Sequence, residues 1–300
     1  MQNEEFNNPD YNAPLRKELA ELPADTIAPS PDNPPWNGWM AIGVWIMSIV
    51  FIVIFPLLFI APYLIQQKAN LLDQAALTEL LTKDKTSILI QLIAIIPAHI
   101  FTLLVAWLVV TRFKKYSFRE MLGWQLNGFK IWHAFVITVF FFGLAIALKS
   151  VFPEQENEMD KLINSSRAAV YLVAFFATFT APIVEEVVYR GVLYSALQRR
   201  FGIILAVSFV TILFAAIHIP QYSSNNVPDY AAIIVLVMLS LILTMIRVKT
   251  KNLLPCIILH TVFNGIQSVI LIFQPYLQSL YEQSLPKTQE VPAIILHLLK

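Results

Sequence analysis

Two adjacent carboxylates and an arginine stand inside a long apolar stretch. Glu185, Glu186 and Arg190 are the only charged residues between about 170 and 197. Charges at membrane depth are costly, so they are rare and usually mark a functional site. Residues four apart on a helix share a face, so Glu186 and Arg190 are expected to pair. Glu185 is rotated by about 100° from Glu186, and it is therefore free to face a cavity.

Two other apolar stretches each carry a histidine with a residue four positions away. Phe214 and His218 end one stretch, while His260 and Asn264 lie within the other. The imidazole of His260 and the amide of Asn264 should share one helix face. A buried glutamate that is ionised near neutral pH is a strong base, and it could activate a water held also by an imidazole. An amide and a second imidazole could stabilise an oxyanion, which predicts peptide hydrolysis without a covalent intermediate.

Two rival chemistries use the same residue types. A glutamate and two histidines could bind zinc, but no histidine in this sequence is followed by glutamate, so the HExxH motif is absent. We therefore predict no metal and no other cofactor. Cys256 lies four residues before His260, which would allow a nucleophilic pair, although packing of a small buried cysteine is the favoured interpretation. His99 and His133 have no matching partners in the sequence and are interpreted as structural.

The elements that must position these residues are membrane-spanning helices. Of the 300 residues, 57% are hydrophobic and only 14% are charged, and the mean hydropathy is +0.64. Together with apolar runs long enough to cross a bilayer, this predicts an all-α, polytopic bundle of about seven transmembrane helices. The spans are expected at about 38–65, 88–110, 132–150, 170–198, 202–218, 231–247 and 253–275.

The chain outside the spans is expected to consist of two polar tails. Residues 1–37 are rich in proline and are predicted to form a mobile polar tail. Residues 38–275 are predicted to form the transmembrane domain, with a catalytic core at 170–270. Residues 276–300 are predicted to form a C-terminal tail that ends in a short interfacial piece, because its apolar part is too short to span a bilayer.

Basic residues cluster in alternate loops, which predicts the orientation of the chain. The loops after the second, fourth and sixth spans carry lysine and arginine, with Arg247, Lys249 and Lys251 assigned to the link after the sixth, so the positive-inside rule places these loops in the cytoplasm. Trp36 and Trp39 are expected to anchor the first span at the interface. The formal net charge of +1 gives no basic field for nucleic-acid binding. No signal peptide is expected, and the predicted location is the plasma membrane of a bacterium, as an integral multi-pass protein.

The three motifs occur in an order that resembles a known family. EEVVYRG at 185–191, FAAIH at 214–218 and HTVFN at 260–264 match the patterns EExxxR, FxxxH and HxxxN or HxxxD of the CPBP family. This family includes the type II CAAX prenyl endopeptidases and bacteriocin-processing membrane proteins, and it is also called the ABI family. Tyr189 stands where the family often has phenylalanine. The resemblance covers about 170–270, roughly a third of the chain.

The resemblance implies an intramembrane glutamic endopeptidase with a role for each motif residue. By this resemblance, Glu185 and His218 activate water. His260 and Asn264 form the oxyanion hole. The resemblance gives Glu186 and Arg190 supporting roles. The implied substrate is a membrane-associated protein or peptide, prenylated or bacteriocin-like, which the enzyme meets in the lipid bilayer.

Other functions stay open, and the predicted depths of the residues agree only loosely. The fold could serve a non-catalytic membrane protein, either a bacteriocin self-immunity factor or a partner scaffold. A transporter is a third possibility, although no repeat or pair of broken helices supports it. At the helical rise per residue, Glu185 lies roughly 20 Å and His218 roughly 24 Å from the cytoplasmic ends of their spans. His260 and Asn264 lie at roughly 12 and 18 Å, so His218 is the poorest fit to a shared site.

Overall fold

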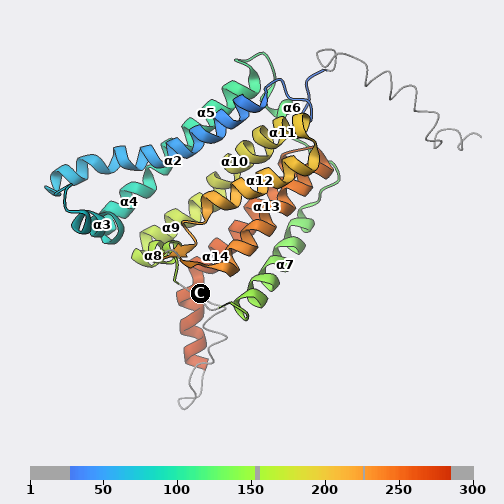
Figure 1. Cartoon of the computed structure of the whole chain (residues 1–300). Coiled ribbons are helices and arrows are strands. Elements are labelled where there is room, and N and C mark those ends of the chain that lie inside the picture. Colours follow the sequence, from blue (N-terminus) through green and yellow to red (C-terminus); the bar gives the residue numbers. More distant parts are fainter. Residues whose placement is uncertain (1–27, 153–155, 226, 285–300) are drawn as a thin grey trace, which may run out of the picture.

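The computed structural model describes residues 28–152, 156–225 and 227–284 as a helical bundle (Figure 1). The predicted all-α class is confirmed for this part of the chain. Its strands are confined to a small antiparallel hairpin, β1 (Ser223–Ser224) and β2 (Val227–Pro228), which pairs Ser224 with Val227. This hairpin joins two helices and adds no sheet to the core.

Six helices of the described chain are long and apolar enough to cross a membrane. They are Gly38–Gln66 (α2), Lys85–Thr111 (α4, Lys85–Ile93, and α5, Ile95–Thr111), Ile131–Lys149 (α7), Arg167–Phe201 (α9 to α11), Tyr230–Thr250 (α13) and Leu254–Leu280 (most of α14). A seventh apolar helix, α12 (Ile203–His218), has 16 residues. The structure thus agrees with the predicted bundle of about seven spans, with the fifth the shortest.

The helix that carries the two glutamates is continuous but contains two π-helical segments. It consists of α9 (Arg167–Phe175), the π-helical turn η3 (Phe176–Thr180), α10 (Ala181–Glu186), the π-helical segment η4 (Val187–Leu193) and α11 (Tyr194–Phe201). π-Helical turns are rare and frequently occur at functional sites. Here one precedes and one follows the short α-helix that bears Glu185 and Glu186.

The core of the bundle lies around η4. All seven residues of this segment are buried. Apolar side chains from α6 (Phe118–Leu122), α12 and the loop before α14 pack against it, including Leu122, Phe214 and Leu253. α2 packs along α5 and against η4, while α14 packs against α7, α9 and η3. The most enclosed part of the bundle is therefore the part that follows the two glutamates.

Short helices close the ends of the bundle. They are α3 (Gln74–Lys83), α6 (Phe118–Leu122) and α8 (Glu158–Ser165). Each begins at a side chain that accepts a hydrogen bond from a backbone N–H of the first turn, which satisfies a donor that the helix itself leaves unpaired. α14 (Leu254–Ser284) continues past the predicted end of the last span, and its last turns extend from the bundle in Figure 1. The predicted interfacial piece near the C-terminus lies outside the described residues.

The segment 28–37 is docked on the bundle, which corrects part of the predicted mobile tail. Trp36 is fully buried, and its indole N–H donates to the carbonyl of Val192 in η4 at 3.0 Å. Its predicted role as an interfacial anchor is therefore wrong, while Trp39 is 79% exposed and fits that role. Residues 1–27 of the predicted tail lie outside the described residues.

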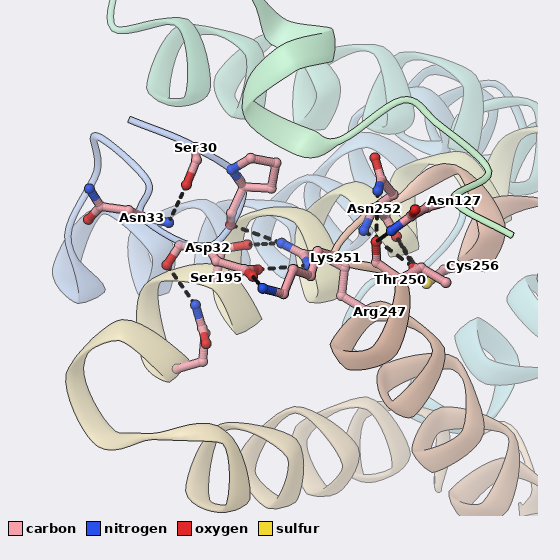
Figure 2. A network of polar contacts seen from close by, with 12 residues as sticks. Ser30, Asp32, Asn33, Asn127, Ser195, Arg247, Thr250, Lys251, Asn252 and Cys256 are labelled. Carbon is pink, nitrogen blue, oxygen red and sulfur yellow. Dashed lines mark hydrogen bonds and ion pairs between the residues drawn. The ribbon is translucent and has the colours of Figure 1, made fainter. Parts of the chain in front are cut away.

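The docked segment carries the acidic partner of a buried arginine. Arg247, near the end of α13, is fully buried and lies 3.0 Å from Asp32 (Figure 2). Its guanidinium also donates to the carbonyl of Pro31 and to the hydroxyl of Ser195. Arg247 was predicted in a cytoplasmic loop, but it belongs to the helix. Burial of a charge requires a partner, so the docked segment is part of the folded bundle.

We expect Asp32→Asn to destabilise the protein. The substitution removes the negative charge beside the buried guanidinium of Arg247, which should lower the free energy of unfolding by about 1–3 kcal/mol. Thermal unfolding in detergent, followed by tryptophan fluorescence, measures the change. Asp73→Asn is the matched control, because Asp73 caps α3 at an exposed site and asparagine caps helices equally well. Equal melting temperatures for the two variants would contradict the prediction.

A glycine allows the chain after α6 to approach the link between α13 and α14. Gly123 has a positive φ of +77°, and its carbonyl accepts a hydrogen bond from the backbone N–H of Leu253 at 2.8 Å. A Cβ at this position would lie 2.7 Å from Oδ1 and 2.8 Å from Cα of Asn252. The bare backbone of Gly123 is therefore required for this contact.

We expect Gly123→Ala to destabilise the bundle more than Gly128→Ala. Both glycines have a positive φ, but a Cβ on Gly128 would meet nothing within 4 Å. Gly128→Ala should cost about 1–2 kcal/mol for the backbone conformation alone. Gly123→Ala should add about 1–3 kcal/mol because the Asn252 backbone must shift. Thermal unfolding of the two variants tests this difference, and equal losses of stability would argue against a tight contact.

Candidate active site

Glu185 lies between two imidazoles. Its Oε1 is 3.9 Å from Nε2 of His218, and its Oε2 is 3.8 Å from Nε2 of His260. Glu185 comes from α10, His218 ends α12, and His260 comes from α14. The separations are too long for direct hydrogen bonds. They would allow a water molecule to lie within hydrogen-bonding distance of both the carboxylate and an imidazole.

The turn at Gly202 brings His218 level with Glu185. Gly202 has a φ of +81° and joins the end of α11 to the start of α12. Glu185 lies 17 positions before this glycine and His218 lies 16 positions after it, so each is about 25 Å away along its helix. The expectation that His218 fits the site poorly is therefore wrong. It arose because α11 ends at Phe201 and not at the predicted residue 198.

The start of α14 lies deep in the bundle, which brings His260 to the same level. Leu253 precedes α14 and lies against η4, where a Cβ on Gly191 would be 3.4 Å from its Cδ2. His260 is seven positions after Leu253, and Glu186 is five positions before Gly191. At the helical rise per residue, His260 therefore lies about 10 Å and Glu186 about 8 Å from the contact between Leu253 and Gly191. α14 therefore starts near the middle of the long helix, and its first two turns reach the glutamates.

Glu186 links an arginine to one of the imidazoles. Arg190 donates to Oε1 of Glu186 at 2.9 Å, and Nδ1 of His260 donates to the same oxygen at 2.9 Å. The side chains of Glu186 and Arg190 are fully buried. The pairing expected from their spacing is thus present. Arg190 also donates to two α13 residues that the sequence analysis did not single out, Ser240 and Thr244.

The hydrogen bonds of the two histidines determine what each can do. Nδ1 of His260 donates to a carboxylate, and Nδ1 of His218 donates to the carbonyl of Phe214 at 2.7 Å. In a neutral imidazole only one nitrogen carries hydrogen. The Nε2 atoms that face Glu185 are therefore acceptors in the neutral rings and donors in the imidazolium forms. His218 can thus accept a hydrogen bond from water, whereas His260 must be charged to donate one to an oxyanion.

Asn264 lies one turn further along α14 than His260. Its Nδ2 donates to the carbonyl of Ala177 in η3 at 2.8 Å. The structure thus brings Nε2 of His218 and Nε2 of His260 each within 4 Å of the Glu185 carboxylate, while Asn264 contacts the turn that precedes the glutamates. The second N–H of its amide is left for another acceptor.

Aromatic rings enclose the site. Phe214 is buried, as expected for a packing residue, and its ring lies 4.6 Å from that of His218 and 5.1 Å from that of Tyr189. The Arg190 guanidinium stacks over the same phenyl ring at 4.7 Å. The hydroxyl of Tyr189 accepts a hydrogen bond from the indole of Trp45 in α2 at 3.0 Å. These contacts tie α2 and α12 to the helix that carries Glu185.

Two further residues lie near the site. His99 of α5, interpreted from the sequence as structural, lies 2.9 Å from Oγ1 of Thr180 in η3. Tyr222 lies in the turn after α12. Burial raises the pKa of Tyr222 to about 12, and the charge of nearby Glu185 adds to this shift. Its hydroxyl therefore keeps its proton at neutral pH. No spacing in the sequence marks either residue, because each reaches the site from a different element.

The rival nucleophile does not face the site. Cys256 is fully buried, and its Sγ donates to the carbonyl of Leu243 in α13 at 3.3 Å. This supports the packing interpretation of the cysteine. His133 accepts a hydrogen bond from the backbone N–H of Lys130 at the start of α7, which fits its structural interpretation. Within the described residues, no group of three or more His, Cys, Asp or Glu side chains is arranged to hold a metal ion.

The segment that builds this site matches a known family. Residues 167–266 match the family model described as Type II CAAX prenyl endopeptidase Rce1-like. This stretch is similar to that family. It spans a third of the chain and runs from the start of α9 into α14, so it contains all three motifs. No curated protein and no solved structure matches the chain.

The match confirms the family resemblance that the three motifs predicted. The matched region is similar to the CAAX-type membrane proteases. Together with the six membrane-length helices of the described chain, the match supports an integral, multi-pass membrane protein. The docked segment, α2 to α7 and the later part of α14 lie outside the matched range. They supply Trp36, Trp45 and Asp32, which contact the matched region.

Proposed function

We propose that the protein is an intramembrane endopeptidase of the Rce1-like type. In this proposal, Glu185 and His218 activate a water molecule, while His260 and Asn264 stabilise the oxyanion. The observation that carries the proposal is the position of Glu185 between the Nε2 atoms of His218 and His260. A base and two groups that can carry protons then surround one place where a carbonyl could be attacked.

The proposed reaction proceeds in two steps. Glu185 takes a proton from water while the water oxygen forms a bond to the substrate carbonyl carbon. The carbonyl electrons move to oxygen, and donors from His260 and Asn264 stabilise the oxyanion. The carbon–nitrogen bond then breaks, and Glu185 returns the proton to the leaving amine. One water is consumed, and the products are a carboxyl group and an amine.

Glu186 and Arg190 support this reaction through His260. The Nδ1 donation from His260 to Glu186 turns Nε2 toward Glu185. With Nδ1 donating to Glu186, Nε2 of His260 can donate to an oxyanion only in the imidazolium form. Arg190 holds the Glu186 carboxylate in place. The supporting pair therefore acts on the direction of a neighbouring ring and does not touch the reacting atoms.

The proposed substrates are membrane-associated proteins or peptides, including prenylated or bacteriocin-like ones. The side chain of Glu185 is 23% exposed, that of His218 13% and that of His260 4%. Glu185 is thus the most accessible of the three, which suits a base that must meet water and substrate. The predicted location in a bacterial plasma membrane is part of this proposal.

Hydrolysis by the purified protein in proteoliposomes tests the proposal. The substrates are fluorogenic peptides that differ only in their lipid: farnesylated, acylated and unmodified. Cleavage with one ¹⁸O incorporated from labelled water, without a hydroxamate when hydroxylamine is added, is the expected result. A trapped hydroxamate would show a covalent acyl intermediate and overturn the mechanism. The non-catalytic scaffold would be favoured by two results together: the purified protein cleaves none of the peptides, and a variant with Glu185 replaced keeps the full cellular function.

A further inference from the structure

Pro182 interrupts the π-helical hydrogen bonds of η3 just before the glutamates. In a π-helix the carbonyl of each residue accepts from the N–H five positions later. The carbonyl of Phe176 accepts from the N–H of Ala181 in this way. The next carbonyl in this register belongs to Ala177 and would need the N–H of residue 182. Because proline has no N–H, Pro182 leaves the Ala177 carbonyl without this donor.

The side chain of Asn264 supplies the missing hydrogen bond. Its Nδ2 lies 2.8 Å from the carbonyl oxygen of Ala177. A carbonyl can only accept, so the nitrogen of the amide, and not its oxygen, must face Ala177. This bond fixes which way the Asn264 amide is turned, and it leaves the second N–H free to donate. The amide is therefore held as a donor by the backbone of the helix that carries Glu185.

Neighbouring contacts hold η3 in place around this carbonyl. The hydroxyl of Thr178 donates to the hydroxyl of Ser268 at 2.9 Å, and Ser268 donates to the carbonyl of Ala174. On the other side, His99 lies 2.9 Å from Oγ1 of Thr180. α14 and α5 thus fix the turn from both sides, so the Ala177 carbonyl has a defined direction.

We infer that Pro182 is a positioning residue: by withholding a backbone donor, it frees the Ala177 carbonyl to orient the Asn264 amide as an oxyanion donor. The inference rests on the proposed function for the role of Asn264 in catalysis. It also gives a reason for asparagine at the last position of the HxxxN or HxxxD pattern in this chain. An aspartate at 264 would bring a carboxylate oxygen against the Ala177 carbonyl, and two acceptors repel each other. The presence of Pro182 therefore favours asparagine in this chain.

Pro182→Ala restores the backbone N–H and gives the kinetic test. Loss of one oxyanion donor costs about 100-fold or more in kcat, which is the expected effect of Asn264→Ala. Pro182→Ala should lower kcat by about tenfold, because the donor is kept but no longer oriented. KM should stay unchanged, and the melting temperature should not fall. Pro62→Ala, which removes a proline inside α2 at an exposed position away from the site, is the matched control and should retain full activity.

The double variant separates positioning from an unrelated effect of the proline. Pro182→Ala with Asn264→Ala should be no slower than Asn264→Ala alone, because Pro182 is inferred to act only through Asn264. Multiplied losses in the double variant would overturn the inference. If Pro182→Ala does not fold, Pro182→Ser restores the same N–H and serves in its place. Full activity of a folded Pro182→Ala or Pro182→Ser protein would likewise overturn the inference.

An NMR measurement tests the orientation without any proteolysis. Protein with ¹⁵N-labelled asparagine in detergent gives side-chain amide signals, and the signal missing in Asn264→Ala belongs to Asn264. This signal should shift in Pro182→Ala and remain in place in Pro62→Ala. An unchanged signal in Pro182→Ala would overturn the inference. A shifted signal in a protein that cleaves no peptide would uphold the orientation by Pro182 and reject the proposed function.

Discussion

Glu185→Gln is expected to abolish hydrolysis while the bundle stays folded. Glutamine has nearly the shape of glutamate but cannot accept the proton of the attacking water. Loss of a general base costs about 10²–10⁴-fold, and the upper end is expected because the same carboxylate returns the proton to the leaving amine. Arg190 pairs with Glu186 and not with Glu185, so the substitution leaves the buried ion pair intact. The melting temperature should therefore change little.

The control for this variant is Glu79→Gln. Glu79 lies in α3, is exposed and forms an ion pair with exposed Lys83 at 3.2 Å. It should retain full activity and stability. The rates of both variants are measured with the most rapidly cleaved peptide from the proteoliposome assay. Authentic activity of Glu185→Gln above that of a blank preparation would reject Glu185 as the base.

The sequence predicted the spans well because their signal is strong. Membrane-length runs of apolar residues need no tertiary context, and the structure places helices at each of them. The ends of the spans were less accurate, and these errors mattered most at the site. Three residues at the end of α11 changed the calculated depth of Glu185. The deep start of α14 depends on the contact of Leu253 with Gly191, which no pattern along the chain reveals.

The motif residues were found from their spacing, but several of their partners were not. Ser240, Thr244 and Arg247 lie on one face of α13 at intervals of four and three residues, and all three are buried. This polar stripe in an apolar helix was a usable signal. Arg247 was assigned to a loop by its charge, so the stripe was missed. Its acidic partner Asp32 lies more than 200 positions away and could not be assigned from the sequence.

The π-helical turns were beyond prediction for a physical reason. Backbone carbonyls within them accept hydrogen bonds from side chains far along the chain: Trp36 for Val192 and Asn264 for Ala177. A proline in an apolar helix predicts a kink but does not say which side chain will take up the freed carbonyl. The sequence could therefore name Asn264 as a candidate, but not its contact with the preceding helix.

Glu186→Gln is expected to destabilise the bundle much more than Glu185→Gln. Removal of one partner of a buried ion pair leaves the other charge uncompensated and costs about 3–5 kcal/mol. The Arg190 side chain is fully buried, and its remaining partners, Ser240 and Thr244, are neutral. Activity should fall as well, because His260 loses the carboxylate that holds its Nδ1. Thermal unfolding of the two variants in the same detergent measures the difference.

The double variant Glu186→Gln with Arg190→Met distinguishes an unpaired charge from lost packing. It removes both charges at once, so it should be more stable than either single variant. Activity should not return with stability, because the carboxylate that accepts the hydrogen bond from Nδ1 of His260 is still absent. A double variant less stable than both single variants would contradict the buried ion pair as the source of the loss. Recovered activity would instead show that Glu186 serves only Arg190, and that His260 keeps its direction without that carboxylate.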